Sequence, residues 1–402
     1  MHGADFERIV RVDHPDPHAI LGPHVEGLDL VVRVFRPDAQ QVVLRPEDGR
    51  HGPRVMGRSH PGGVFSAKFV GMERPFPYRV EARSSRGVMV TRDPYAFVPS
   101  LDDEFDPGAA GAYRTLAKRL GAHVTQREGV RGTVFAVWAP SARRVSVVGD
   151  FNKWDGRRHA MRRTKYGVWE IFAPDVSEGA TYKFEIKTSE GIVLLKSDPV
   201  AFAAEVRPSH ASRVAAQNHP FADQEWLDER PRENAASHPM SIYEVHIGSF
   251  RRVRRGDKTN DWSTYRELCG GLVDHVEALG FSHVEFLPVM EHPFDGSWGY
   301  QVTGYFAPTS RFGEPDDLRA LVDRFHARGI GVILDWTPAH FPKDSFALGR
   351  FDGTPLYEHG DPRRGEHREW KTFVFDYGKP AVRNFLIASA LYWIESFHAD
   401  GL

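Results

Sequence analysis

The stretch IGVILDWTPAHFP, from Ile330 to Pro342, decides the fold of the C-terminal half of this sequence. Its first five residues form an almost continuous apolar run, which is typical of a strand buried on both faces of a parallel sheet. The run ends at Asp335, and His340 follows five residues later. Parallel α/β barrels place their active sites at the carboxyl ends of the strands. The stretch therefore predicts a buried strand and one edge of a site.

Strands and helices alternate on both sides of this stretch. We predict strands at 241–246, 284–287 and 330–334, and helices at 265–279, 315–328 and 381–398. The first helix has a capping box, Thr264 with Glu267, and Gly280 ends it. Its apolar spacing places Cys269 and Leu279 on the buried face. The alternation favours a parallel α/β barrel or a doubly wound sheet. Three strands do not close a barrel, so only the first part of such a domain is expected.

The N-terminal half repeats itself. Residues 34–42 align with 137–145 at an offset of 103, residues 78–81 with 182–185 at 104, and Asp93-Pro94 with Asp198-Pro199 at 105. Each copy consists of short alternating strands separated by turn residues, with little helical periodicity. The repeat predicts two tandem β-sandwiches of immunoglobulin-like size. With the polar, proline-containing stretch at 228–234, it places the domains at 1–110, 111–225 and 226–402.

Composition excludes several classes of protein. The 402 residues include 52 Lys plus Arg and 54 Asp plus Glu, a net charge of −2, which argues against a nucleic-acid partner. No apolar run is long enough to span a membrane, and the N-terminus lacks a secretory signal. The single cysteine, Cys269, cannot form an internal disulfide, which fits a reducing cytoplasm. No phosphate-binding loop or zinc motif is present, and we expect neither cofactor nor metal.

Two loops carry the side chains that are suited to chemistry. The segments 288–301 and 335–342 follow the second and third predicted strands and are rich in aromatic, Asp, Gln and His side chains. Flat aromatic faces beside such polar groups suit a sugar, whose C–H faces stack while its hydroxyls form hydrogen bonds. The alternatives are structural: an aromatic packing corner, an Asp that caps a helix, and a His satisfied within the core. The residues alone indicate a carbohydrate-active domain.

Several segments resemble the bacterial glycogen branching enzymes of the α-amylase superfamily. The resemblance lies in WGYQVTGYFAPTSRFG at 298–313, GVILDWTPAHFP at 331–342 and IYEVHIGSF at 242–250. DPHAILGPH at 16–24 is similar to the start of their extra N-terminal module. WAP at 138–140 with GDFNKW at 149–154 resembles a family-48 carbohydrate-binding module. The resemblance implies two tandem immunoglobulin-like β-sandwiches followed by an incomplete (β/α)8 barrel.

The resemblance also implies roles for individual residues. Tyr300 would stack beneath the glucose next to the cleaved bond, His340 would bind the 6-hydroxyl of that sugar, and Asp335 would orient an arginine. Gln301 would make a nearby polar contact, and Trp154 would stack on glucan in the second sandwich.

The implied reaction cleaves an α-1,4-glucan with retention and transfers the chain to a 6-hydroxyl, using two carboxyl groups about 5 Å apart. Both carboxylates are expected beyond Leu402, so none of the catalytic residues lies in this chain, which is expected to be inactive alone. Donor and acceptor would both be α-1,4-glucan. Two alternatives remain: a hydrolase of the same superfamily, which debranches or releases trehalose, and a non-catalytic glucan-binding fragment.

Overall fold

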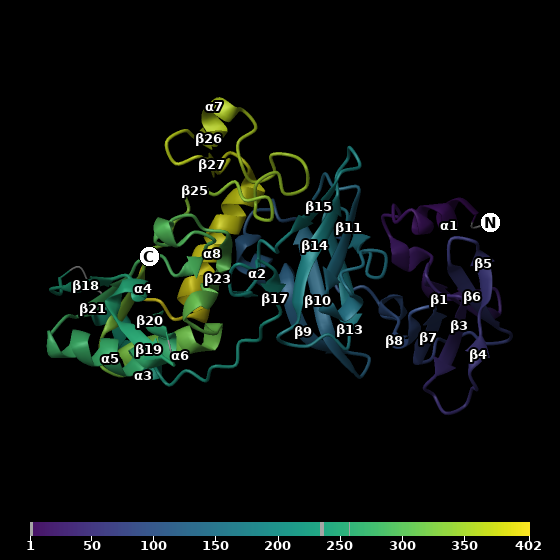
Figure 1. Ribbon diagram of the computed structural model, residues 1–402, viewed down its shortest axis with the longest axis horizontal. Coiled ribbons are helices and arrows are strands. Elements are labelled where there is room, and N and C mark those ends of the chain that lie inside the picture. Colours follow the sequence, from purple (N-terminus) through teal and green to yellow (C-terminus); the bar gives the residue numbers. More distant parts are fainter. Residues whose placement is uncertain (1–2, 234–236, 257) are drawn as a thin grey trace. The chain divides into compact units, whose positions relative to one another are not determined.

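The computed structural model describes residues 3–233, 237–256 and 258–402. The chain forms two compact units, one of residues 1–105 with 123–195 and the other of residues 106–122 with 196–402. The first unit consists almost entirely of strands, and the second contains the parallel sheet and the long helices (Figure 1). The three-domain division made from the sequence stays a prediction beside these two units.

The first module of the N-terminal unit is a pair of antiparallel four-stranded sheets. One sheet has the order β1-β2-β6-β5 and the other the order β4-β3-β7-β8. Alternate side chains such as Leu30, Val32 and Val34 are fully buried and meet Val42 and Leu44 of the other sheet in one core. The elements are α1 (Gly3–Val10), η1 (Pro17–Ala19), β1 (Gly22–Glu26), β2 (Asp29–Phe35), β3 (Gln41–Pro46), β4 (Arg54–Val55), β5 (Gly57–His60), β6 (Val64–Phe69), β7 (Tyr78–Ser84), β8 (Gly87–Arg92) and η2 (Pro94–Ala96).

The second module repeats this strand order, as the sequence repeat predicts. One sheet, β9-β10-β13-β12, matches β1-β2-β6-β5, and in the other β14 pairs with β11 and β15 as β7 pairs with β3 and β8. Asp93 and Asp198, aligned in the repeat, each accept a hydrogen bond from the main-chain N–H two residues later. The elements are β9 (Gly121–Arg127), β10 (Val130–Trp138), β11 (Arg144–Gly149), η3 (Asp150–Asn152), β12 (Arg162–Arg163), β13 (Val168–Pro174), β14 (Thr181–Lys187) and β15 (Val193–Lys196).

The second unit is built on the parallel sheet β18-β21-β24. These strands, Ile242–Val245, His283–Phe286 and Gly331–Leu334, lie within a residue or two of the predicted ones. Val284 and Phe286 are fully buried, and the Phe286 ring contacts Phe325 of the helix beside it. Glu285 lies between them in sequence and points to the other face of the sheet, because successive side chains of a strand alternate.

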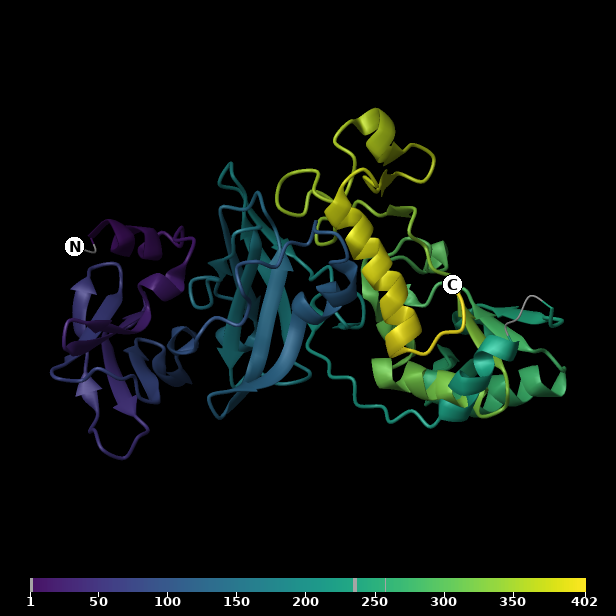
Figure 2. The same cartoon turned by 180° about the vertical axis from the view of Figure 1, so that it is seen from behind.

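Three helices accompany the sheet: α5 (Tyr265–Ala278), α6 (Pro315–His326) and α8 (Pro380–Ser396). Helix α2 (Tyr113–Arg119) packs on α8, seen in yellow in Figure 2. Asn384 of α8 donates hydrogen bonds of 2.8 Å to the carbonyls of Pro107 and Ala109. These bonds hold the segment before α2 against α8.

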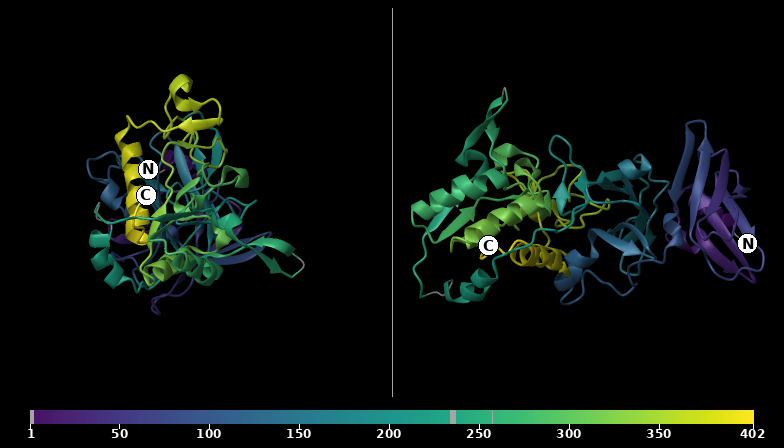
Figure 3. Two further views of the ribbon diagram at one scale, coloured as in Figure 1. Left: turned by 90° about the vertical axis from the view of Figure 1, so that its left-hand side faces the viewer. Right: turned by 90° about the horizontal axis from the view of Figure 1, so that it is seen from below.

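The remaining elements of the second unit are short or lie in its loops. The hairpin β19–β20 projects from the rest of the unit (Figure 3). These elements are α3 (Gln224–Glu233), α4 (Ile247–Phe250), α7 (Pro362–Gly365), η4 (Asp295–Ser297), η5 (Ser310–Phe312), β16 (Ala203–Ala204), β17 (Ser212–Arg213), β19 (Arg252–Arg255), β20 (Lys258–Trp262), β22 (Met290–Glu291), β23 (Gly304–Pro308), β25 (His340–Phe341), β26 (Glu366–His367) and β27 (Thr372–Val374).

One local prediction needs correction. Leu279, expected on the buried face of the first helix, is 54% exposed, because α5 ends at Ala278 and Leu279 already belongs to the turn before Gly280. The polar stretch that marks the predicted domain boundary lies largely in helix α3, which contains Pro231 and is held through Trp226, whose indole N–H donates to Asp400 at 2.9 Å. Cys269 is half-buried and donates weakly to the Tyr265 carbonyl.

A buried network fixes the segment before α3 to the end of α6. Nδ1 of His326 lies 2.7 Å from Asp223, and its Nε2 lies 2.9 Å from Asp400. His398 adds a second contact to Asp223 at 2.8 Å, and the Trp226 ring stacks on His326 at 5.3 Å. Asp400 also accepts from the Val332 N–H, so the network connects helix α6, the segment before α3 and strand β24.

The capping box of α5 provides the first stability prediction. The Thr264 hydroxyl accepts from the Glu267 N–H at 3.3 Å, and Glu267 accepts from the Thr264 N–H at 2.7 Å. We expect Thr264→Ala to lower the free energy of unfolding by about 1 kcal/mol, because the Glu267 N–H in the first turn loses its acceptor. Urea unfolding measures the loss. Thr264→Ser keeps the hydroxyl and should cost only a few tenths of a kcal/mol; equal losses in the two variants would contradict the prediction.

Candidate functional site

Three residues expected in the site converge at the carboxyl end of the parallel sheet. Asp335 directly follows β24, His340 begins β25, and Tyr300 lies in the loop before β23. The Tyr300 hydroxyl donates to Oδ2 of Asp335 at 2.5 Å. The main chain of Tyr300 hydrogen-bonds to the His340 ring, and the Tyr305 hydroxyl donates to the His340 carbonyl at 2.9 Å. Residues from three separate segments thus form one cluster.

The ring of Tyr300 is held at its hydroxyl end and is partly exposed to solvent. Its side chain is anchored at the hydroxyl, while the residue keeps 37% of its surface exposed. Burial of the phenol and its hydrogen bond to Asp335 raise the pKa of Tyr300, so the hydroxyl stays protonated and remains a donor. Gln301 follows it in the loop and is half-buried. A ring held at one end with an open surface suits stacking against a flat ligand.

His340 has a ring nitrogen without a protein partner. The residue is 8% exposed, and among the residues that the structure describes its Nδ1 makes no hydrogen bond. Burial, with the nearby His367 ring, lowers the pKa of His340, which favours the neutral imidazole at pH 7. The Trp370 ring lies 4.9 Å from it and stacks on His367 at 4.0 Å. The free nitrogen can therefore bind a hydroxyl group.

Trp154 belongs to the other unit. It follows η3 in the loop after β11, with a left-handed backbone at φ 58°. Its indole N–H donates to Asp150 at 2.9 Å, which fixes the ring while the residue stays 39% exposed. Within its own module the indole presents an exposed aromatic surface.

Sequence reasoning missed two carboxylates beside this cluster. Glu244 of β18 and Glu285 of β21 are register partners on neighbouring strands. Burial and the negative charges of Glu244 and Asp335 raise the pKa of Glu285. The signal was present in the sequence, since each Glu interrupts an otherwise apolar strand on the face turned away from the helices. The face of the sheet next to Tyr300 is therefore acidic.

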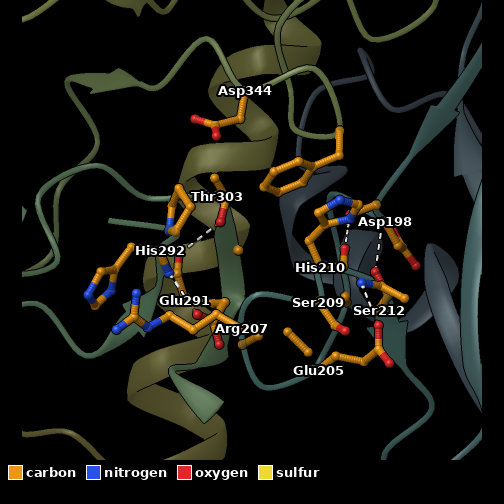
Figure 4. Close-up of a pocket in the computed structure, with 18 of the residues that line it drawn as sticks. Asp198, Glu205, Arg207, Ser209, His210, Ser212, Glu291, His292, Thr303 and Asp344 are labelled. Carbon is orange, nitrogen blue, oxygen red and sulfur yellow. Dashed lines mark hydrogen bonds between the residues drawn. The ribbon is translucent and has the colours of Figure 1, made fainter. Parts of the chain in front are cut away.

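A cavity of about 310 Å³ adjoins the loop that carries Tyr300 (Figure 4). Glu291, His292 and Thr303 line one side, and the segment between β16 and β17 lines the other. The His210 ring stacks on Phe346 at 4.2 Å in this wall. The described lining residues do not include the three clustered residues, so the cavity is a neighbouring feature.

A network of ion pairs holds the segment from β22 to η5, which includes the loop that carries Tyr300. Arg311 Nη1 donates to Glu291 at 2.9 Å, and Nε of the same arginine donates to Asp295 at 2.8 Å. Glu291 also accepts from the Ser310 N–H at 2.7 Å. Asp295 pairs in addition with Arg207. Burial raises the pKa of Glu291, and Arg311 opposes that shift. The network fixes both ends of the loop from which Tyr300 extends.

His292 in this loop predicts a dependence of stability on pH. Burial and the positive charge of Arg311 lower its pKa from 6.5 to about 4, and its Nδ1–H donates to the Met290 carbonyl at 2.8 Å. The folded state keeps the ring neutral, so the stabilisation is complete above pH 6.5 and is lost as pH falls towards 4.

We expect the wild-type protein to lose roughly 2 kcal/mol more than His292→Gln between about pH 7 and 4.5, as urea unfolding at the two pH values can measure. The amide of glutamine still donates to the carbonyl and does not titrate. Parallel pH curves for the two proteins would contradict this assignment.

Comparison with family models finds three consecutive matches. Residues 2–95 match "alpha-1,4-glucan branching enzyme GlgB, N-terminal domain", and residues 119–201 match "Carbohydrate-binding module 48 (Isoamylase N-terminal domain)". Residues 269–351 match "Alpha amylase, catalytic domain". The described part of the chain contains no helix that is long and apolar enough to cross a membrane.

Curated relatives match the chain over nearly its whole length. The 1,4-alpha-glucan branching enzyme GlgB of Myxococcus xanthus is 50% identical over 406 residues, covering 99% of this chain and 54% of the relative. That of Rubrobacter xylanophilus is 52% identical over 398 residues, covering 98% of this chain and 54% of the relative. The chain thus spans about half the length of the curated relatives it matches.

Solved structures share the fold at lower identity. A pullulanase from an Anoxybacillus species, complexed with maltotriose, aligns with a TM-score of 0.54 and 19% identity over 94% of this chain and 57% of its own. The apo pullulanase of Paenibacillus barengoltzii aligns with a TM-score of 0.56 and 20% identity over 74% of this chain and 48% of its own. At this identity the likeness concerns the fold alone.

Proposed function

We propose, from the premise that this chain belongs to the family of the bacterial 1,4-α-glucan branching enzymes, that it supplies the substrate-binding edge of a glycogen-branching active site. The observation that carries the proposal is the cluster of Tyr300, Asp335 and His340 at the carboxyl end of the parallel sheet. Barrel enzymes bind their substrates at that end. The whole enzyme would cleave an α-1,4 linkage and transfer the chain to a 6-hydroxyl, making an α-1,6 branch.

Each residue of the cluster has a proposed task. Tyr300 stacks beneath the glucose next to the cleaved bond, held by its bond to Asp335. His340 offers its free Nδ1 to the 6-hydroxyl of that sugar. Asp335, already engaged with Tyr300, orients an arginine near the nucleophile. Gln301 adds a polar contact from the same loop.

The covalent chemistry needs two further carboxyl groups. In a retaining transfer, one carboxylate attacks the anomeric carbon while the other acid protonates the departing sugar oxygen. The same group then takes the proton from the incoming 6-hydroxyl, which releases the glycosyl unit from the enzyme. Because the relatives are about twice as long as this chain, we propose that the part of the enzyme beyond the matched half supplies both groups.

The N-terminal modules are proposed to support binding of the same substrate. Two immunoglobulin-like sandwiches precede an (β/α)8 barrel, with boundaries near residues 110 and 225. Trp154 stacks on glucan in the second module, which its exposed ring supports. α-1,4-Glucan serves as both donor and acceptor, and the enzyme works in the cytoplasm.

A chimaeric protein tests this function. Residues 1–402 are joined to the C-terminal half of the Rubrobacter xylanophilus relative and incubated with amylose, and new α-1,6 linkages are counted by isoamylase debranching. We expect branches from the chimaera and none from the 402-residue chain alone, because a retaining transfer needs both carboxyl groups. Free reducing sugar without new branches would indicate a hydrolase instead. Branching by the 402-residue chain itself would overturn the assignment of the carboxylates.

A further inference from the structure

A second cavity, of about 200 Å³, lies within the N-terminal unit, between its two modules. Strand β8 and the residue after β2 contribute one wall, and the loop after β11 with the end of β13 contributes the other. Arg36 and Arg92 line it from the first module and Arg158 from the second, with Asp175 as the carboxylate. The lining thus holds three guanidinium groups and one carboxylate, while the other carboxylates that pair with these arginines lie outside it.

Two of these arginines have weak hydrogen-bond acceptors. Nη1 of Arg158 points to the sulfur of Met89 at 3.0 Å, and a thioether is a poor acceptor for a cation. Nη2 of Arg36 reaches the Thr91 hydroxyl only at 3.4 Å. Guanidinium groups prefer oxyanions, with which they form short, charge-assisted and often bidentate bonds. Neither Arg158 Nη1 nor Arg36 Nη2 donates to an oxyanion.

The third arginine has an unsatisfied donor. Nη1 of Arg92 pairs with Glu47, but its buried Nε has no hydrogen-bond partner among residues 3–233, 237–256 and 258–402. Oδ1 of Asp175 lies 3.5 Å from this nitrogen, beyond a good hydrogen bond, on a side chain that is itself 53% exposed. A buried donor without a well-placed acceptor costs free energy, so the Arg92 guanidinium is incompletely satisfied by its protein partners.

Neighbouring carboxylates balance part of the arginine charge: Asp155 pairs with Arg158 and Glu47 with Arg92, each through one edge of the guanidinium. Asp93 is buried and accepts from the Tyr78 hydroxyl at 2.7 Å and from the Tyr95 N–H. Asp155 accepts from Arg157 at 2.9 Å and from Arg158 Nε at 3.3 Å. His159 also lines the cavity, and burial with the positive charges around it lowers its pKa to about 3. The ring is therefore a neutral wall.

We propose that this cavity binds a phosphate group, either as inorganic phosphate or as the phosphoryl group of a small sugar phosphate. Its volume lies below the ~300–1,000 Å³ of pockets for larger ligands, so a compact anion fits. Arg158 and Arg92 provide the main donors from opposite walls. Because each module contributes a donor, a bound phosphate joins the two modules and stabilises their mutual arrangement. This site is separate from the proposed branching site and independent of it.

Binding is tested on the 402-residue chain with inorganic phosphate as probe. Calorimetric titration and thermal melting are carried out at constant ionic strength set with sodium chloride. We expect saturable binding, and a rise in the melting temperature that chloride does not reproduce. Arg158→Gln and, separately, Arg92→Gln should weaken binding at least about tenfold, as loss of one charge-assisted contact implies. Two variants at different walls keep the test valid if one of them fails to fold.

The neighbouring arginine is the matched control. Arg157 bonds to Asp38 and Asp155 on the protein surface and does not line the cavity. Arg157→Gln should therefore bind phosphate as the wild-type protein does. A hexose monophosphate that binds tighter than phosphate would assign the site to a sugar phosphate, and equal affinities would assign it to the free anion. Absence of saturable binding, or equal losses in Arg157→Gln and Arg158→Gln, would overturn the proposal.

Discussion

Replacement of Arg311 by alanine is expected to lower the free energy of unfolding of the C-terminal unit by about 3 kcal/mol. The guanidinium is nearly fully buried and pairs with Glu291 and Asp295, so its loss leaves the buried Glu291 carboxylate without its cation. Breaking a buried ion pair from one side typically costs about 3–5 kcal/mol. We expect the lower end of this energy range, because two main-chain N–H groups still donate to Glu291 in the variant. Urea unfolding followed by tryptophan fluorescence measures the change.

A surface arginine of the same unit is the control. Arg213 pairs with Glu314 at 2.9 Å, but its side chain is 27% exposed and that of Glu314 is 58% exposed, against 2% for Arg311. Arg213→Ala should cost less than about 1 kcal/mol, as exposed ion pairs do. In the Arg311→Ala background, Glu291→Gln should restore part of the stability, because a neutral amide needs no cation. Similar costs for the two arginines would show that the buried network does not hold the loop.

His340→Ala in the completed chimaera is expected to lower kcat about 100-fold, far more than its loss of stability accounts for. The Nδ1 atom has no partner within the described chain, so its removal breaks no protein hydrogen bond at that atom. Its proposed partner is the substrate hydroxyl, and a contact that strengthens in the transition state affects kcat more than KM. Loss of one such transition-state hydrogen bond typically costs roughly 100- to 1,000-fold.

A substitution of the neighbouring histidine is the control that distinguishes substrate binding from packing. His367 lies 6.5 Å from His340 and stacks on Trp370, but has no proposed contact with the sugar. His367→Ala should change kcat by less than about threefold. Branching rates with amylose and unfolding curves are measured for both variants. A fall in kcat that merely follows the loss of stability in both would assign His340 a structural role.

Local signals in the sequence predicted the helices and strands of the C-terminal unit well. The capping box of Thr264 and Glu267 has both of its bonds, and the apolar run before Asp335 forms the largely buried strand β24 beside β21. The repeat correctly indicated two modules of common strand order. These features depend on residues close in the chain or on a pattern repeated along it. The meeting of Tyr300 with Asp335, 35 residues apart, followed from the rule that strand ends share one edge of a parallel sheet.

Contacts between distant residues were beyond this reasoning. The pairing of Glu291 with Arg311 crosses a loop of irregular backbone, where no periodicity relates the two positions. Helix α3 was not predicted, because its composition is polar and includes Pro231; its position depends on Trp226 and on tertiary contacts far along the chain. The neighbouring carboxylates Glu244 and Glu285, one exposed and one half-buried, were visible only as interruptions of apolar strands.

The shared strand order of the N-terminal modules relates the loops of one copy to those of the other. Trp154 lies five residues beyond β11, and its counterpart, five residues beyond β3, is His51. Both residues are exposed and each bonds to a nearby aspartate, Trp154 to Asp150 and His51 to Asp48, while the His51 ring also stacks on Phe76 at 5.3 Å. The two modules thus present different rings to solvent at one place in the architecture: a broad indole in the second and a smaller imidazole in the first.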